Sequence, residues 1–483
     1  MAQVAVKSHS STCNAVSLSL CSLSGHSEGV YPFRCGRPSC KDPIVKLVPT
    51  AFSFRSTFPL PTNLVRHVID GTNLLIAPEL PAWTTATDAE CDALLRMSRG
   101  ATIEEACLCL KSWGVEDARG DLSRLLTKMA VDGFMPNESA SAVEVSKTTL
   151  QLHVTNACNL RCTHCYVSSG IAFPDEIGLD DCKRIVDAAR HRYEKVFVSI
   201  SGGEPLLVPW LPDLLAYVKS FNLRVSLLSN GMLWTDKRVA ALRPYVDLVN
   251  VSLDGASADV HDAIRGPGAF RQALRGVQRL GAAGIDVGIN VCLMKSNLQD
   301  VEANLFALVR SLPFQVSVQF GKFVDEGRGF DIRSESPTAD EMARLLPILA
   351  EKFLSSGWSP TSTSKRATCG FGASYSVYAN GDVSPCLSPR YIAGNILREN
   401  VEDVLERVSS NAARAHVDLM PLCRSCDLRY ICGGKCHLAQ LTQGQNIAQN
   451  TCDAEYRVNY YRKLARRAAS QETVMMPIVS RVL

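Results

Sequence analysis

Six short apolar segments recur through the middle of this chain, and their spacing constrains the fold more than any other feature. They are TLQLHVT, VFVSI, RVSLL, LVNVSL, VGINVCL and QVSVQF, and they lie between residues 149 and 325. The stretches between them are long enough for crossover helices, a rhythm typical of a parallel α/β sheet. Because six units fall short of a closed (β/α)8 barrel, we expect a partial (β/α)6 barrel over residues 146–330, with its chemistry at the carboxyl ends of the strands.

A loop with three cysteines follows the first of these strands. The sequence NACNLRCTHCY places Cys158, Cys162 and Cys165 in a C-x3-C-x2-C arrangement. Three thiolates can hold three irons of a [4Fe-4S] cluster and leave the fourth iron open to a substrate or cofactor. A structural zinc site is the alternative, but such sites normally present two pairs of ligands, and His164 is poorly placed beside Cys165 to face the same ion.

This loop resembles that of the radical S-adenosylmethionine (SAM) superfamily. The resemblance implies a [4Fe-4S] cluster whose unique iron is chelated by the amino and carboxylate groups of SAM. It implies reductive cleavage of SAM to methionine and a 5'-deoxyadenosyl radical, which takes a hydrogen atom from the substrate. It also implies that Tyr166, directly after Cys165, lies near the adenine of SAM.

Two glycines and a carboxylate follow the second strand, in the segment SGGEP. Gly202 and Gly203 allow the backbone to approach a ligand closely, and Glu204 places a carboxylate beside it. By itself this segment is an ordinary turn. After the second strand of this barrel it resembles the GGE motif of the superfamily, which holds the amino group of SAM.

Small polar residues end the next two strands. Ser229 ends the third strand, and Ser252 and Asp254 lie at the end of the fourth. The family resemblance implies that they contact the ribose or the methionine part of SAM, although residues of this kind also simply end strands. Arg265 is a weaker candidate partner for a carboxylate, since an exposed helix arginine is at least as well expected there.

Seven spaced cysteines mark the last part of the chain, over residues 367–460. Their pattern resembles the cysteine-rich SPASM domain of radical SAM enzymes that mature peptides and proteins. The resemblance implies two auxiliary [4Fe-4S] clusters, and therefore three clusters in all. The first would be held by Cys369, Cys386 and Cys436, and the second by Cys423, Cys426, Cys432 and Cys452.

The first auxiliary set is one cysteine short, so its fourth ligand is open or is not a cysteine. A carboxylate, water or a substrate group would each serve. The alternative for the run from Cys423 to Cys436 is a zinc ribbon. The remaining cysteines of the helices and strands, Cys91, Cys107, Cys109, Cys182 and Cys292, are expected to be small buried side chains without a role.

A small domain is expected over residues 59–140. LVRHVI and NLLIA flank Asp70-Gly71 as a hairpin, and three helical stretches follow, the second starting with a capping box between Thr102 and Glu105. This order predicts a winged-helix-like module. It resembles, loosely, the modules that bind leader peptides by adding them as a strand to a sheet edge.

The other segments carry little information. Residues 1–58 are rich in Ser and predict an irregular, poorly ordered extension. Residues 331–366 are interpreted as a helical linker and residues 461–483 as a C-terminal tail.

Charge and hydropathy exclude two classes of partner. The net charge of +3 does not predict a nucleic-acid binder. No apolar run approaches the ~20 residues that span a bilayer, and no secretory signal is recognisable. We therefore expect no membrane partner and a cytoplasmic location.

The leading functional hypothesis is a radical SAM enzyme that acts on a ribosomally made precursor peptide with a leader sequence. It would install a thioether, ether or carbon–carbon crosslink, or carry out a related oxidation, with flavodoxin or ferredoxin as electron donor. One alternative is a radical SAM enzyme that acts on a small molecule or a protein subunit, with the N-terminal domain as a docking module. A second is an iron-sulfur or zinc protein without catalysis.

Overall fold

The computed structural model defines two β-sheets and the helices around them. The residues that it describes are 54–135, 147–353, 365–386, 388, 390–436 and 452–479. Most of the predicted N-terminal extension therefore lies outside the described residues. Its last residues, 54–58, are irregular, but Phe58 is buried and Thr57 forms an isolated β-bridge to Thr102.

Six consecutive parallel strands make up most of the larger sheet and match the six predicted segments. Consecutive strands are neighbours, and buried apolar side chains occupy both faces, as parallel sheets require. The strands are β4 (Lys147–His153), β5 (Lys195–Ser201), β6 (Arg224–Ser229), β7 (Leu248–Ser252), β8 (Asp286–Leu293) and β9 (Val316–Lys322).

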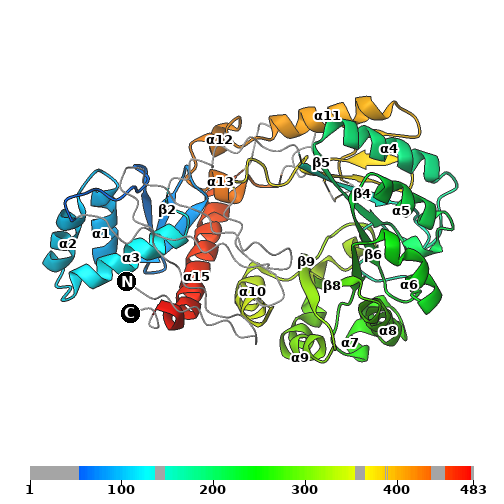
Figure 1. Ribbon diagram of the computed structural model, residues 1–483, viewed down its shortest axis with the longest axis horizontal. Coiled ribbons are helices and arrows are strands. Elements are labelled where there is room, and N and C mark those ends of the chain that lie inside the picture. The colour runs from blue at the N-terminus through cyan, green and yellow to red at the C-terminus, as the bar shows by residue number, and fades with distance from the viewer. Residues whose placement is uncertain are drawn as a thin grey trace, which may run out of the picture. The chain divides into compact units, whose positions relative to one another are not determined.

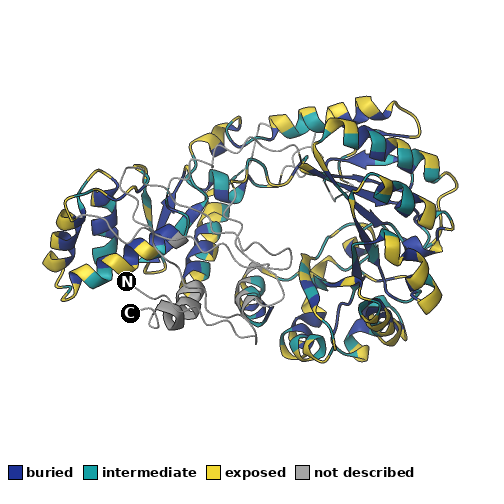
Figure 2. Cartoon of the chain, viewed as in Figure 1, coloured by how far each residue is buried: buried dark blue, intermediate teal, exposed yellow. Residues whose placement is uncertain are grey.

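The crossover helices lie along one face of this sheet (Figure 1). Each turns its buried stripe toward the strands and its exposed stripe outward, as the alternating colours of Figure 2 show. The result is an open α/β barrel with one continuous core. The helices are α4 (Leu179–Arg192), α5 (Leu211–Ser220), α6 (Asp236–Leu242), α7 (Ala258–Arg265), α8 (Ala269–Ala282) and α9 (Leu298–Arg310).

The sheet does not stop at the six barrel strands. β10 (Ser374–Val377) pairs in parallel with β4, and β11 (Asp382–Ser384) and β12 (Gly394–Asn395) follow in antiparallel pairing. The order of the nine strands is therefore β12-β11-β10-β4-β5-β6-β7-β8-β9. The cysteine-rich region thus begins as an extension of the barrel sheet, a connection that was not predicted. Helix α11 (Val401–Arg414) follows β12, the edge strand, and packs beside α4.

The N-terminal region forms an antiparallel sheet followed by three helices. β1 (Val65–Ile69) and β2 (Thr72–Ala77) pair through the predicted turn, where Asp70 and Gly71 both have positive φ, as a tight hairpin requires. A further strand, β3 (Ala82–Ala86), was not predicted. The predicted capping box at the start of α2 (Ile103–Ser112) is present, between α1 (Asp88–Met97) and α3 (Ala118–Val131). This order of strands and helices does not by itself identify the segment as a winged helix.

Two more helices complete the described chain. α10 (Ala339–Phe353) lies within the predicted helical linker and packs on α9. α15 (Ala454–Val479) packs against β1, β2 and β3, with Leu464 buried against Leu74 and Ile76. It crosses the boundary predicted at residue 460, so this segment is a helix on the N-terminal sheet rather than a separate tail. None of the described helices combines the length and apolar character that crossing a bilayer requires.

Candidate active site

The three cysteines of the first motif share one loop after β4. Cys162 is buried, and Cys158 and Cys165 are half-buried around Leu160 and Ala269. Backbone amides already point at two of the sulfurs: the amide of Leu160 lies 3.4 Å from Sγ of Cys158, and that of Ser169 lies 3.3 Å from Sγ of Cys165. Such N–H donors stabilise thiolate sulfur, so the loop is arranged for metal-bound cysteines.

The three sulfurs of this loop do not form a site for a single metal ion. Among the described residues, no three His, Cys, Asp or Glu side chains converge on one point as the ligands of a single ion would. Each thiolate of a [4Fe-4S] cluster binds its own iron, so cluster ligands need no common point. The burial that raises the pKa of Cys162 also requires a positive partner for its thiolate, and Arg265 and Arg328 lower that pKa in part.

The SGGEP segment lies directly against the cysteine loop. A Cβ on Gly203 would meet the carbonyl oxygen of Ala157 at 2.0 Å, so only glycine allows this approach. Glu204 is fully buried, and its carboxylate accepts hydrogen bonds from Oγ of Ser229 and the amide of Asn230. Burial raises the pKa of Glu204 to about 7, although these hydrogen bonds lower it in part. The structure therefore joins two predicted residues, Glu204 and Ser229, in one network.

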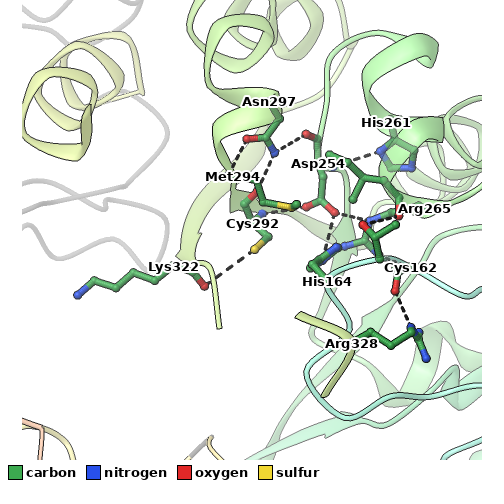
Figure 3. Close-up of polar contacts among 12 residues, drawn as sticks. Cys162, His164, Asp254, His261, Arg265, Cys292, Met294, Asn297, Lys322 and Arg328 are labelled. Carbon is green, nitrogen blue, oxygen red and sulfur yellow. Dashed lines mark hydrogen bonds and ion pairs between the residues drawn. The ribbon is translucent and has the colours of Figure 1, made fainter. Parts of the chain in front are cut away.

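Asp254 stands at the centre of a second network (Figure 3). Its carboxylate accepts a 2.6 Å hydrogen bond from Nε of Arg265 and one of 2.8 Å from the amide of Cys292. Nε2 of His164 lies 3.4 Å from the same carboxylate. Burial alone would raise the pKa of Asp254, but Arg265 and His164 hold it below its usual value.

Arg265, a weaker candidate in the sequence analysis, thus has a defined position beside Asp254. Its side chain is largely buried, and Nη1 lies 3.8 Å from Sγ of Cys162. The exposed helix arginine considered as its alternative is wrong, because α7 turns this side chain inward against Asp254. The guanidinium of Arg265 therefore contacts both Asp254, after the fourth strand, and Cys162.

Several polar atoms at this end of the barrel are buried without a hydrogen-bond partner among the described residues. Two of these atoms are Nδ1 of His164 and Oδ1 of Asn290. Asn290, within β8, lies opposite Ser252, the last residue of β7. Burial lowers the pKa of His164 to about 4, so its ring is neutral at pH 7. Orphaned buried polar atoms are costly unless a ligand or water satisfies them. A polar molecule with donors and acceptors, such as SAM, fits this end of the barrel.

Tyr166 lies on a different side of the cysteine loop from the two networks. Its ring meets His153 edge-on, and His153 in turn packs on Tyr378 after β10. Tyr166 therefore borders the edge of the sheet where the cysteine-rich region joins. The prediction that it lies near the adenine of SAM stays a prediction.

One segment that braces the site was missed at the sequence level. Arg328, after β9, donates from Nε to the carbonyl of Cys162 at 2.8 Å and from its amide to the carbonyl of Cys165 at 3.0 Å. Beside it, Glu326 accepts from Oγ of Ser388, whose amide lies 3.4 Å from Sγ of Cys386. Residues 326–328 therefore connect the first cysteine loop with the auxiliary region. The run DEGRG carries no motif that would have singled it out.

Some of the C-terminal cysteines lie close enough to influence one another's pKa, and their assignment to two clusters stays a prediction. Thiolates at Cys369 and Cys436 lie close enough to Cys386 to contribute to raising its pKa, after the larger effect of burial. Burial raises the pKa of Cys426 to about 11, and Cys423 and Cys452 add to it. The thiolate of Cys432 likewise contributes to raising the pKa of Cys452, after the larger effect of burial.

The second group borders the N-terminal sheet. Asp427, directly after Cys426, forms an ion pair with His67 of β1 and accepts a 2.6 Å hydrogen bond from the hydroxyl of Tyr461 on α15. The rings of His67 and Tyr461 are stacked 4.1 Å apart. Arg429 adds an ion pair to Glu79. The predicted ligands of the second auxiliary cluster are therefore part of the surface on which the N-terminal sheet rests.

Known proteins with similar sequences and folds agree with this arrangement. Residues 152–308 match the radical SAM superfamily, and residues 369–427 match an iron-sulfur cluster-binding domain of the SPASM type. The mycofactocin maturase MftC of Mycolicibacterium smegmatis is 30% identical over 315 residues, which are 61% of this chain and 79% of that protein. This chain belongs to the radical SAM/SPASM family.

Other members of the radical SAM/SPASM family are more similar over shorter spans. MftC of Mycobacterium tuberculosis is 38% identical over 208 residues, 42% of this chain and 52% of that protein. The chain thus spans about half the length of this relative. The fold of Streptococcus suis SuiB covers 82% of this chain at 15% identity, with TM-scores of 0.51 for its complex with S-adenosylmethionine and 0.50 for that with its precursor peptide SuiA.

Proposed function

We propose that this protein is a radical SAM enzyme that modifies a ribosomally made precursor peptide. The observation that carries the proposal is the convergence of three elements at one end of the barrel: the cysteine loop after β4, the Glu204 network and the Asp254 network. Family relatives named as maturases, and a SuiB structure that contains a precursor peptide, support a peptide substrate.

The residues divide into two functions at this site. Cys158, Cys162 and Cys165 would hold a [4Fe-4S] cluster, and the strand-end residues Gly202, Gly203, Glu204, Ser229, Ser252 and Asp254 would bind SAM, with Tyr166 beside its adenine. The bound cofactors supply reductive cleavage of SAM, hydrogen-atom abstraction and an acceptor for the electron left on the substrate. Arg265 and Arg328 hold the cysteine loop, and neutral His164 offers Nδ1 to a bound ligand.

The auxiliary region would complete the set of three clusters. Cys369, Cys386 and Cys436 would hold one, with a fourth ligand that is not a cysteine, and Cys423, Cys426, Cys432 and Cys452 would hold the other. The N-terminal segment, residues 59–140, would act as a winged-helix-like module that recognises a leader peptide. Its outer strands, β1 and β3, each pair with only β2 among the described strands, which leaves edges that a peptide strand can extend. Flavodoxin or ferredoxin in the cytoplasm would supply the electron.

Anaerobic reconstitution tests the proposal. We expect about twelve irons per chain, four for each of three clusters, and formation of 5'-deoxyadenosine from SAM and dithionite. Co-expression with a short peptide encoded beside the gene should change the mass of that peptide, by the loss of two hydrogens for a crosslink.

Controls separate the possible outcomes. Cys165→Ala should abolish 5'-deoxyadenosine formation, whereas Cys182→Ala, on α4 and outside the cluster sets and both networks, should retain it. A fully loaded protein that makes no 5'-deoxyadenosine would contradict the enzymatic proposal. Cleavage of SAM without any modified peptide would favour the alternative of a small molecule or a protein subunit as substrate.

A further inference from the structure

One surface of the barrel carries a concentration of arginines. Arg271, Arg275 and Arg279 follow one another at intervals of four residues on α8, so they share one side of the helix, and all three are exposed. Arg243, also exposed, comes from the short 3-10 helix after α6. We call these four residues the arginine face.

The arginine face is continuous and hollowed. One groove of about 670 Å³ is lined by residues that include Arg243, Arg275 and Arg279. A second groove of about 310 Å³ is lined by Arg271, Arg275, Arg279 and Met232. Because the two grooves share Arg275 and Arg279, the surface runs without interruption from Arg243 to Met232.

Little negative charge offsets this surface. Arg279 lies 3.3 Å from Asp236, whose side chain is 90% exposed. Within the part of the chain that the structure describes, Arg243, Arg271 and Arg275 form no ion pair with a carboxylate. Like charges four residues apart on a helix repel each other and destabilise it slightly. The fold does not require this spacing, so the arginines are better explained by a negatively charged partner.

The arginine face ends at the first cysteine loop. Met232, at the end of the second groove, packs against the cluster cysteines. Its amide donates to Oδ1 of Asn230 at 3.0 Å, and Nδ2 of Asn230 lies 3.9 Å from Sγ of Cys158. Ala269, the first residue of α8, is buried against the first cysteine loop. Arg271 lies only about 3 Å further along the axis of this helix. A partner bound at this end of the face therefore lies beside Met232, which packs against the cluster of Leu160, Cys162 and Ala269.

We propose that the arginine face docks an acidic one-electron carrier protein, which reduces the cluster held by Cys158, Cys162 and Cys165. This inference rests on the proposed function, because it requires that cluster. The carrier, a reduced flavodoxin or ferredoxin, loses one electron and the cluster gains one, and no atom is transferred. Positive charge around a short route to the cluster raises the rate of productive encounter with an anionic protein, an effect that salt screens.

Charge reversal at Arg271 and Arg275 tests the docking. R271E/R275E alters exposed side chains outside the cluster and SAM networks. With an acidic flavodoxin and its reductase at low salt, the variant should reduce the cluster at least about tenfold more slowly than wild type. With dithionite as reductant, the two proteins should form 5'-deoxyadenosine at the same rate. Added salt should slow the flavodoxin reaction of wild type and have little effect on the variant.

A matched control carries the same change in charge elsewhere. Arg224 begins β6 and Arg310 ends α9, so both exposed side chains lie at the end of the strands away from the site. R224E/R310E should react with flavodoxin as wild type does.

Three outcomes would overturn the docking proposal. They are equal flavodoxin rates for the two double variants, no reduction of wild type by acidic flavodoxin or ferredoxin while dithionite succeeds, and a loss in R271E/R275E confined to the KM for the peptide. The last would assign the face to the substrate. Failure of wild type with dithionite would instead contradict the proposed function.

Discussion

The two cysteine-rich regions of this protein are supported in different ways. The first loop lies at the mouth of a parallel sheet, and buried charges hold it: Arg265 and Arg328 both contact Cys162. In the auxiliary region, Cys369 and Cys436 are exposed. Short strands and one-turn helices, such as α12 (Pro421–Arg424) and α13 (Arg429–Cys432), surround the remaining auxiliary cysteines. The difference teaches that the first site is built by the barrel, whereas the second would depend on bound metal for more of its order.

The largest difference is expected from removal of single cysteines. Cys162→Ala should lower 5'-deoxyadenosine formation on the order of a thousandfold or more, because the cluster that binds SAM loses a ligand. Cys426→Ala should retain SAM cleavage with dithionite but lose modified peptide. Equal loss of 5'-deoxyadenosine in both variants would show that the two regions are not independent.

Iron removal should separate the two regions by their dynamics. In protein treated with a chelator under reducing conditions, amides of residues 423–436 should lose protection from hydrogen exchange, since their ordering depends on bound metal. Amides of β4 to β8 should stay protected. Hydrogen exchange with mass spectrometry measures the two sets of amides in one sample. An equal loss of protection in both sets would contradict the proposed difference between the two cysteine-rich regions.

Asp254→Asn tests the buried charges of the first site. The substitution leaves Arg265 buried without its counter-charge and should lower the free energy of unfolding by about 3–5 kcal/mol, measured by urea denaturation at pH 7. The wild-type contribution should be present at neutral pH and disappear as the pH falls through the lowered pKa of Asp254, because its folded pKa lies below the unfolded value. Asp236→Asn, at an exposed ion pair, should change stability by less than about 1 kcal/mol.

His67→Ala should have the smallest effect. It removes the ion pair to Asp427 and the stacking on Tyr461, so the N-terminal sheet should lose local protection at β1, at a cost of about 1–2 kcal/mol. Hydrogen exchange at residues 65–69 checks this. The measured change in 5'-deoxyadenosine formation with dithionite should be negligible, and a large one would show that the junction reaches the first site.

Local patterns predicted much of the fold. The six barrel strands, the hairpin at Asp70-Gly71 and the capping box at Thr102 depend on neighbouring residues, whose periodicity and turn chemistry are visible in the sequence. The loop with Cys158, Cys162 and Cys165 was visible in its local spacing, whereas the assignment of the C-terminal cysteines to two clusters comes from the family resemblance and stays a prediction.

Long-range pairings were not predictable in this way. Nothing near Ser374 indicates that β10 pairs with β4, more than 200 residues away along the chain. The same holds for the contacts of Arg265 and Arg328 with Cys162, which lie 103 and 166 residues apart along the chain. Elements that are distant in sequence turn these two charged side chains toward the cysteine loop.

The pairing of β10 with β4 has a consequence for how this chain can be divided. Removing the C-terminal third would uncover the backbone donors and acceptors of β4, the strand that leads directly into the first cysteine loop. An exposed parallel edge of this kind invites pairing with other chains. An isolated barrel should therefore tend to aggregate, so the domain that holds the auxiliary cysteines also protects the edge of the barrel that holds the first cysteine loop.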